Sequence, residues 1–196
     1  FASAEAFRQF AEKSWRSLTL AEPVLKKHRV RLALENHKDW RVPELLDLLR
    51  RISSEFVGVC VDTGNNLALV EDPMAVVESL APFAFSSHLK DMAVQEYEEG
   101  LLFSEVALCE GFLDLKRIVA LLRQANPKLQ FNLEMITRDP LKIPCLTEKY
   151  WATMPTLPAR ELAAGLAMVR RQGWQKPLLR RSGLMTADQL AMEDKL

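Results

Sequence analysis

Four segments of the chain share one pattern, in which a short and almost wholly apolar run ends in polar residues and an amphipathic stretch follows. The apolar runs lack the alternation of a half-exposed strand, which is typical of parallel strands buried on both faces. The amphipathic stretches repeat apolar residues every three or four positions and therefore predict helices. The expected strands are 31–34, 56–61, 84–89 and 129–133, and the helices that follow them are 43–52, 73–81, 115–124 and 158–172.

Three further segments lie outside these units. The first stretch of the chain repeats apolar residues at helical spacing, so we expect a helix that continues or restarts at Pro23 and ends near His28. Residues 92–111 lengthen the third connection and are interpreted as an insertion. Residues 173–196 are expected to form a surface tail with one short capped turn at Thr186, because glycine and proline interrupt any periodic pattern there.

Strands that alternate with helices along a chain are typical of an α/β domain with a parallel sheet. We therefore assign residues 1–172 to one α/β domain and residues 173–196 to the tail. Four units are fewer than the eight of a closed barrel, which usually needs about 250 residues. An open sheet of four or five strands also fits the length, so the pattern alone leaves both architectures open.

The composition excludes several classes of partner. The 196 residues carry 26 basic and 26 acidic side chains, so no large field of one sign is available to hold nucleic acid or an anionic membrane. No apolar run approaches the roughly 20 residues of a membrane span, and the first residues do not form a signal peptide. Three cysteines without a CxxC pair indicate a reducing compartment, so we expect a cytoplasmic protein.

A residue able to bind a metal ion follows or ends each expected strand: Glu35, Asp62, His88 and Glu134. The carboxyl ends of parallel strands meet at one face, so these side chains are expected to converge. Three carboxylates and one imidazole favour Mn²⁺, Mg²⁺ or Co²⁺, with Zn²⁺ also possible. The alternative for each acidic residue is a solvated loop or a helix cap, and for His88 it is a hydrogen-bonded structural histidine.

An ordered set of motifs resembles the second half of the xylose isomerase-like TIM barrels, a group of ketose epimerases, hydroxypyruvate isomerases, inosose dehydratases and an endonuclease branch. The motifs lie between about residues 20 and 172 and read LALENH, CVDTGNN followed by EDP, SSHLKD, LCEGFLDL and NLEMITRDP. The resemblance implies a (β/α)8 TIM barrel of which this chain covers strands five to eight. It also implies that the four residues named above are the metal ligands and that the N-terminal half-barrel is missing.

Two positions depart from the pattern of this family. Cys109 lies where members often have glycine, so the backbone there is expected to differ. Asn65 lies where a histidine often follows the aspartate ligand, and the chain has only three histidines, His28, His37 and His88. Because the endonuclease branch uses that additional histidine in a zinc cluster, the sequence argues against a trinuclear zinc nuclease.

The resemblance implies a divalent-metal-dependent sugar isomerase or epimerase that works through a metal-stabilised enediolate. Glu35 and Glu134 are then the catalytic acid/base pair, because the first and last glutamates of the related enzymes flank the substrate. Asp62 and His88 mainly hold the metal. The substrate is expected to be a small sugar or sugar derivative.

Four further residues are candidates for substrate binding. His37 either hydrogen-bonds substrate hydroxyls or caps a loop. Asn65 is expected to orient a metal-binding side chain by a hydrogen bond from outside the set of ligands. Lys90 either neutralises charge on a substrate oxygen or pairs with the neighbouring aspartate. Arg138 either binds an acidic group of the substrate or pairs with the aspartate that follows it.

Two other functions remain open from the sequence. A metal-dependent dehydratase similar to inosose dehydratase needs the same metal and base and differs in what leaves the substrate. A non-catalytic half-barrel that serves as a binding or assembly module is the second, because a half-barrel leaves sheet edges and an apolar interior uncovered. We expect such a chain to pair with its N-terminal half or with a second copy as a homo-oligomer.

Overall fold

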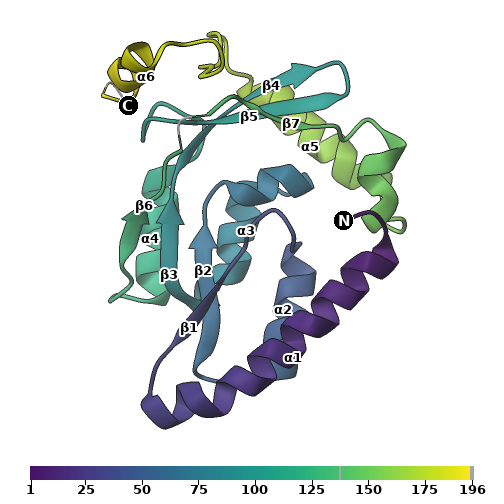
Figure 1. Cartoon of the computed structure of the whole chain (residues 1–196), viewed down its shortest axis with the longest axis vertical. Coiled ribbons are helices and arrows are strands. Elements are labelled where there is room, and N and C mark those ends of the chain that lie inside the picture. The colour runs from purple at the N-terminus through teal and green to yellow at the C-terminus, as the bar shows by residue number, and fades with distance from the viewer. Residues whose placement is uncertain (137, 195–196) are drawn as a thin grey trace.

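The computed structural model describes residues 1–136 and 138–194, which form two sheets and the helices that pack beside them (Figure 1). The first sheet holds β1 (Leu32–Glu35), β2 (Val57–Asp62), β3 (Ala84–Leu89) and β6 (Phe131–Leu133), and the second holds β4 (Asp91–Tyr97), β5 (Gly100–Val106) and β7 (Leu141–Ile143). The α-helices are α1 (Ala4–His28), α2 (Val42–Ile52), α3 (Pro73–Leu80), α4 (Leu115–Ala125), α5 (Ala159–Gln172) and α6 (Thr186–Glu193), and short 3-10 helices are η1 (Asn65–Leu69), η2 (Ala81–Phe83) and η3 (Glu148–Thr153).

The four strands of the first sheet are parallel and lie in the order β1, β2, β3, β6. Successive side chains of a strand point to opposite faces. Val57, Val59 and Val61 of β2 therefore share one face and belong to the apolar core that also contains the buried leucines of α2 and α4. Asp62, at the end of the same strand, points to the face that these helices leave open.

The helices begin where the sequence provides acceptors for their free backbone N–H groups. The Asp72 carboxylate accepts a hydrogen bond from the backbone N–H of Ala75 at the start of α3, and Asp114 does the same for α4. Helix α1 runs through Pro23 without interruption and ends at His28, where the next residue, Arg29, caps it with a left-handed φ of 53°. Helices α1, α2, α3 and α4 each precede a strand of the first sheet, namely β1, β2, β3 and β6.

Strands β4 and β5 form an antiparallel hairpin within the segment that the sequence marked only as an insertion. The Asp91 carboxylate closes its base by accepting hydrogen bonds from the backbone N–H groups of Met92, Cys109, Gly111 and Leu113. Cys109 adopts a left-handed φ of 71°, a conformation that glycine adopts more readily than other residues. A Cβ atom on Gly111 would lie 2.1 Å from the Asp91 carboxylate, so the turn requires glycine there.

The start of the expected surface tail packs against this hairpin. The backbone N–H of Trp174 donates to the carbonyl of Val94 at 2.8 Å, and the Gln95 side chain donates to the carbonyls of Trp174 and Lys176. Leu178 is buried in a small apolar cluster beside the hairpin. These contacts connect the start of the expected tail to the hairpin, and residues 195 and 196 of that tail lie outside the described residues.

The α/β class and the parallel sheet predicted from the sequence are confirmed. Each of the four expected strands is present within two residues of its predicted bounds. Within residues 1–136 and 138–194 the parallel sheet has four strands, so a closed eight-stranded barrel is not formed there. Among the described residues, no helix is both long and apolar enough to cross a membrane.

Candidate metal centre

The sheet brings its strand-end residues to one place. Glu35 ends β1, Asp62 ends β2, His88 lies next to the last residue of β3, and Glu134 directly follows β6. Asp62 and His88 are register partners on neighbouring strands. One possible ligand atom from each of the four side chains lies within 4.8 Å of the other three.

Several of these atoms face one another without well-directed hydrogen bonds. His88 Nδ1 lies 2.6 Å from Glu134 Oε2 and 3.4 Å from Glu35 Oε1. Nevertheless His88 Nδ1 and Glu134 Oε2 are buried without a hydrogen-bond partner of acceptable geometry among the described residues. Asp62 Oδ2 also lacks such a partner, although the Lys90 ammonium lies 2.9 Å from it. Crowded carboxylates repel one another unless a cation lies between them. The donor set therefore fits a divalent cation that prefers oxygen ligands.

Backbone and amide groups hold Asp62 in its place. Its Oδ1 accepts hydrogen bonds from the backbone N–H groups of Gly64 and Asn65 at 2.9 and 2.7 Å. The buried Asn36 side chain bridges the tips of β1 and β2, because it accepts from the backbone N–H of Asp62 and donates to its carbonyl. The Asp62 carboxylate is thus oriented before any ion binds.

Lys90 supplies a buried positive charge beside these carboxylates. Its Nζ lies 2.9 Å from Asp62 Oδ2 and 3.4 Å from Glu134 Oε1. Burial alone would lower the pKa of Lys90, but the carboxylates of Asp62, Glu105 and Glu134 raise it above its usual value. Lys90 is therefore a permanent cation within the cluster and pairs with these groups, not with its neighbour Asp91.

Glu105 is a site residue that the sequence analysis missed. It lies on β5 of the inserted hairpin, and its Oε1 contacts Arg138 Nη2 at 2.8 Å and Lys90 Nζ at 3.7 Å. Its other oxygen accepts from the backbone N–H of Ile136. A single carboxylate in the run from Leu101 to Val106, which is apolar apart from Ser104, was the signal that could have identified it.

Arg138 thus pairs with Glu105, which corrects the alternative that it pairs with Asp139. Asp139 instead accepts hydrogen bonds from the backbone N–H groups of Arg181 and Ser182. The guanidinium of Arg138 remains partly exposed beside the cluster. It can therefore still contact a substrate that binds there.

Asn65 and His37 lie at different distances from the cluster. Asn65 Nδ2 donates to Glu35 Oε1 at 3.0 Å, and its Oδ1 accepts from Lys38 Nζ at 2.9 Å. The His37 side chain is exposed and forms no hydrogen bond with the described residues. The loop after β1 therefore presents Lys38, and not His37, to the residues that surround Asp62.

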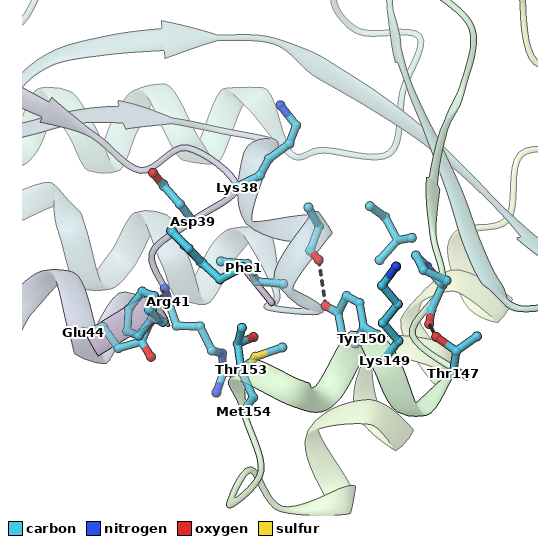
Figure 2. Close-up of a pocket in the computed structure, with 15 residues that line it drawn as sticks. Phe1, Lys38, Asp39, Arg41, Glu44, Thr147, Lys149, Tyr150, Thr153 and Met154 are labelled. Carbon is cyan, nitrogen blue, oxygen red and sulfur yellow. Dashed lines mark hydrogen bonds between the residues drawn. The ribbon is translucent and has the colours of Figure 1, made fainter. Parts of the chain in front are cut away.

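A cavity of about 420 Å³ opens beside Lys38 (Figure 2). Its wall combines charged residues of the loop after β1 with residues of η3, among them Lys149 and Tyr150. The Tyr150 hydroxyl donates to the carbonyl of Ala68 at 2.7 Å, so its ring is fixed in the wall. A volume of this size is within the range of small-molecule sites.

Comparison with known proteins identifies the fold and a relative. The family model described as "Xylose isomerase-like TIM barrel" matches residues 2–171. The chain is similar to the 3-oxo-isoapionate decarboxylase of Pectobacterium atrosepticum, with 32% identity over 94 residues. That alignment covers 47% of this chain and 34% of the decarboxylase, so the likeness spans about a third of the relative's length.

Solved structures of the same fold align with most of the chain. A xylose isomerase-like TIM barrel protein from Mycobacterium smegmatis in complex with magnesium aligns with a TM-score of 0.58 and 15% identity, over 81% of this chain and 52% of that one. The probable 3-DHS dehydratase AsbF of Bacillus anthracis aligns with a TM-score of 0.51 and 14% identity, over 84% and 58%. The chain spans about half the length of these structures.

Proposed function

Because the chain belongs to the xylose isomerase-like TIM barrel family, we propose that it is a divalent-metal-dependent enzyme that isomerises or epimerises a sugar. The reaction proceeds by transfer of a proton to and from the carbon next to the substrate carbonyl. The observation that carries this proposal is the cluster of three carboxylates and one imidazole at adjoining strand ends, with ligand atoms within 4.8 Å of one another.

Glu35, Asp62, His88 and Glu134 are the proposed ligands. A divalent cation bound there would polarise the carbonyl and stabilise the negative charge of the enediolate. The oxygen-rich donor set favours Mn²⁺, Mg²⁺ or Co²⁺ over a metal that prefers thiolates. Magnesium in the similar Mycobacterium smegmatis structure supports this choice.

Exposure separates Asp62 from the other three residues. The Asp62 side chain is 0% exposed, whereas the side chains of Glu35, Glu134 and His88 are 29%, 28% and 32% exposed. A proton can be exchanged with a substrate only by a group that the substrate can reach. Glu35 and Glu134 are the accessible carboxylates of the cluster, so we assign them as the acid/base pair, while Asp62 and His88 mainly hold the cation.

Lys90 and Arg138 support this chemistry from the side of the inserted hairpin. Lys90 lies 3.4 Å from Glu134 Oε1 and orients that carboxylate. Arg138 is fixed by Glu105 with part of its guanidinium exposed. Both cations are placed to offset negative charge that develops on substrate oxygens.

Decarboxylation is the second candidate, because the similar Pectobacterium atrosepticum protein is a decarboxylase. In that reaction the bond between the carboxylate carbon and its neighbour breaks, CO₂ leaves, and the electron pair passes to the carbonyl oxygen. Glu134 or Glu35 then donates a proton to the carbon. A dehydratase would begin with proton removal and would end with loss of a hydroxyl group.

We also propose that the parallel sheet is completed by other strands. Leu133 of the edge strand β6 and Ile136 after it are 65% and 45% exposed. An unpaired sheet edge with apolar neighbours favours association. The N-terminal half of a barrel or a second copy of the chain would cover it, and a non-catalytic assembly module would require the same surface.

Incubation of the Mn²⁺-loaded full-length protein with ketoses and keto-sugar acids in ²H₂O tests the proposed reaction. We expect deuterium at the carbon next to the carbonyl, detected by mass spectrometry, together with an isomeric product. Release of CO₂ would instead support decarboxylation. A protein that binds Mn²⁺ but yields neither exchange nor CO₂ with any substrate would contradict an enzymatic role.

A further inference from the structure

One residue, Asn65, connects Lys38 to the candidate metal centre by hydrogen bonds. Its Nζ donates to Asn65 Oδ1 at 2.9 Å, and the same amide donates from Nδ2 to Glu35 Oε1 at 3.0 Å. Because an amide group is only about 2.3 Å wide, Nζ lies at most roughly 8 Å from that glutamate oxygen. The Asn65 backbone also donates to Asp62, which fixes the whole arrangement.

Among the described residues, the positive charge of Lys38 has no carboxylate partner, unlike the charges of the neighbouring cations. Lys90 pairs with Asp62, and Arg138 pairs with Glu105, but no carboxylate of residues 1–136 and 138–194 forms an ion pair with Lys38. Burial and the nearby cations Arg138 and Lys90 lower the pKa of Lys38. A half-buried ammonium in this position gains from an added anion.

The Lys38 side chain does not turn towards the adjacent acid. Figure 2 shows its side chain extending away from that of Asp39, at the border of the cavity described above. An ammonium has three N–H donors, and the described residues use one of them, through Asn65. Two donors are therefore available to a ligand.

We propose that Lys38 binds a carboxylate of the substrate, so that the protein acts on a keto-sugar acid in preference to a neutral ketose. This inference rests on the proposed function, because the substrate carbonyl must lie at the four strand-end residues. A carboxylate one or two carbons from that carbonyl would then reach Nζ. Lys38 selects the substrate, while Glu35 and Glu134 carry out proton transfer.

The chemistry of the position favours a carboxylate over a phosphate. A phosphate carries nearly two charges and three acceptor oxygens, and it is usually held by several donors at once. Lys38 offers two free donors, while Lys90 and Arg138, the two cations that lower its pKa, are already paired with carboxylates. One carboxylate matches both the charge and the number of donors.

Binding of three ligands that differ at one carbon tests the inference. The probes are 2-keto-D-gluconate, D-fructose and D-fructose 1-phosphate, titrated calorimetrically into the Mn²⁺-loaded full-length protein. We expect the wild-type protein to bind 2-keto-D-gluconate most tightly. Lys38→Met should weaken that binding by about 10- to 100-fold, the usual value of a hydrogen bond to a charged group, and leave D-fructose binding nearly unchanged.

Two further variants separate a binding role from a structural one. Lys38→Arg should retain most of the affinity for 2-keto-D-gluconate, and Lys116→Met on the exposed face of α4 should retain all of it. Equal affinity of the wild-type protein for 2-keto-D-gluconate and D-fructose would overturn the inference without any variant. Equal weakening of all ligands by Lys38→Met, or tightest binding of D-fructose 1-phosphate, would overturn it as well.

The outcomes distinguish this inference from the proposed function. Normal Mn²⁺ binding and turnover of a neutral ketose, without a carboxylate preference, would contradict the role of Lys38 alone. A Lys38-dependent carboxylate preference without proton exchange or CO₂ release would support Lys38 and contradict the proposed reaction. A wild-type protein that does not bind Mn²⁺ would contradict both the role of Lys38 and the proposed function.

Discussion

Replacement of Lys90 by methionine should destabilise the metal-free protein and strengthen its binding of Mn²⁺. The Lys90 side chain is 1% exposed and its Nζ lies 2.9 Å from the equally buried Asp62 carboxylate, with Glu105 and Glu134 close by. Removal of one partner from a buried ion pair typically costs about 3–5 kcal/mol. For a chain of this length that cost corresponds to a decrease in Tm of roughly 6–20 °C.

A bound cation should reverse much of this loss, because it supplies positive charge to the same carboxylates. The Lys90 ammonium also forms an ion pair with Asp62 Oδ2, a proposed ligand atom, and so competes with a bound cation. Removal of the ammonium should therefore raise the affinity for Mn²⁺. Thermal unfolding followed by circular dichroism, with chelator and with Mn²⁺, measures both effects, and Lys116→Met on α4 is the control. A Lys90→Met protein that is as stable as the wild type in chelator, or that binds Mn²⁺ more weakly, would refute this reasoning.

Three other changes test separate parts of the structure. Glu134→Gln should reduce turnover by about 10²- to 10⁴-fold while much of the Mn²⁺ binding is retained, and near-full activity would exclude Glu134 as a catalytic acid or base. Gly111→Ala places a Cβ atom against the Asp91 carboxylate and should cost about 1–3 kcal/mol in urea unfolding, whereas an unchanged midpoint would show that the turn can adjust. Burial raises the pKa of Cys60 to about 11, so at pH 8 iodoacetamide should alkylate the exposed Cys109 well before Cys60. Peptide mass spectrometry measures the order of alkylation, and earlier alkylation of Cys60 would contradict this prediction.

The sequence was informative about the parallel sheet because each strand is a local feature. The apolar run that ends at Asp62 can be recognised as a strand from its own residues alone. The residue at which the strand ends is then given by the point where the run stops. Neighbouring parallel strands then bring their ends together without further information. The convergence of the four strand-end side chains was therefore predictable, although their roles as ligands remain a proposal.

The inserted hairpin could not be predicted in the same way. Its outer partner β7 lies about 40 residues later in the chain, and the segment from Trp174 to Leu178 that packs against it lies further still. Such pairings depend on contacts that are distant in sequence and leave no periodic signal. Glu105 and the pairing of Arg138 were missed for this reason.

Lys38 shows a different limit of the sequence. A lysine in a polar loop is usually a solvated surface residue, and nothing in its immediate neighbours distinguishes it. Its position depends on the Asn65 amide, which itself depends on the turn after β2. Only the arrangement of three segments in space shows that its charge lacks a carboxylate partner among the described residues.

The origin of Glu105 in the hairpin has a consequence for how this protein can diversify. The strand ends hold the cation ligands, whereas an appended element between β3 and α4 sets the positions of Lys90 and Arg138. Substitutions in that appendage that reach only Arg138 can alter which chemical groups are accepted and leave the strand ends unchanged. Those that shift Lys90, which is paired with Asp62, alter metal retention as well, so selectivity and metal retention are coupled through this lysine over the history of the protein.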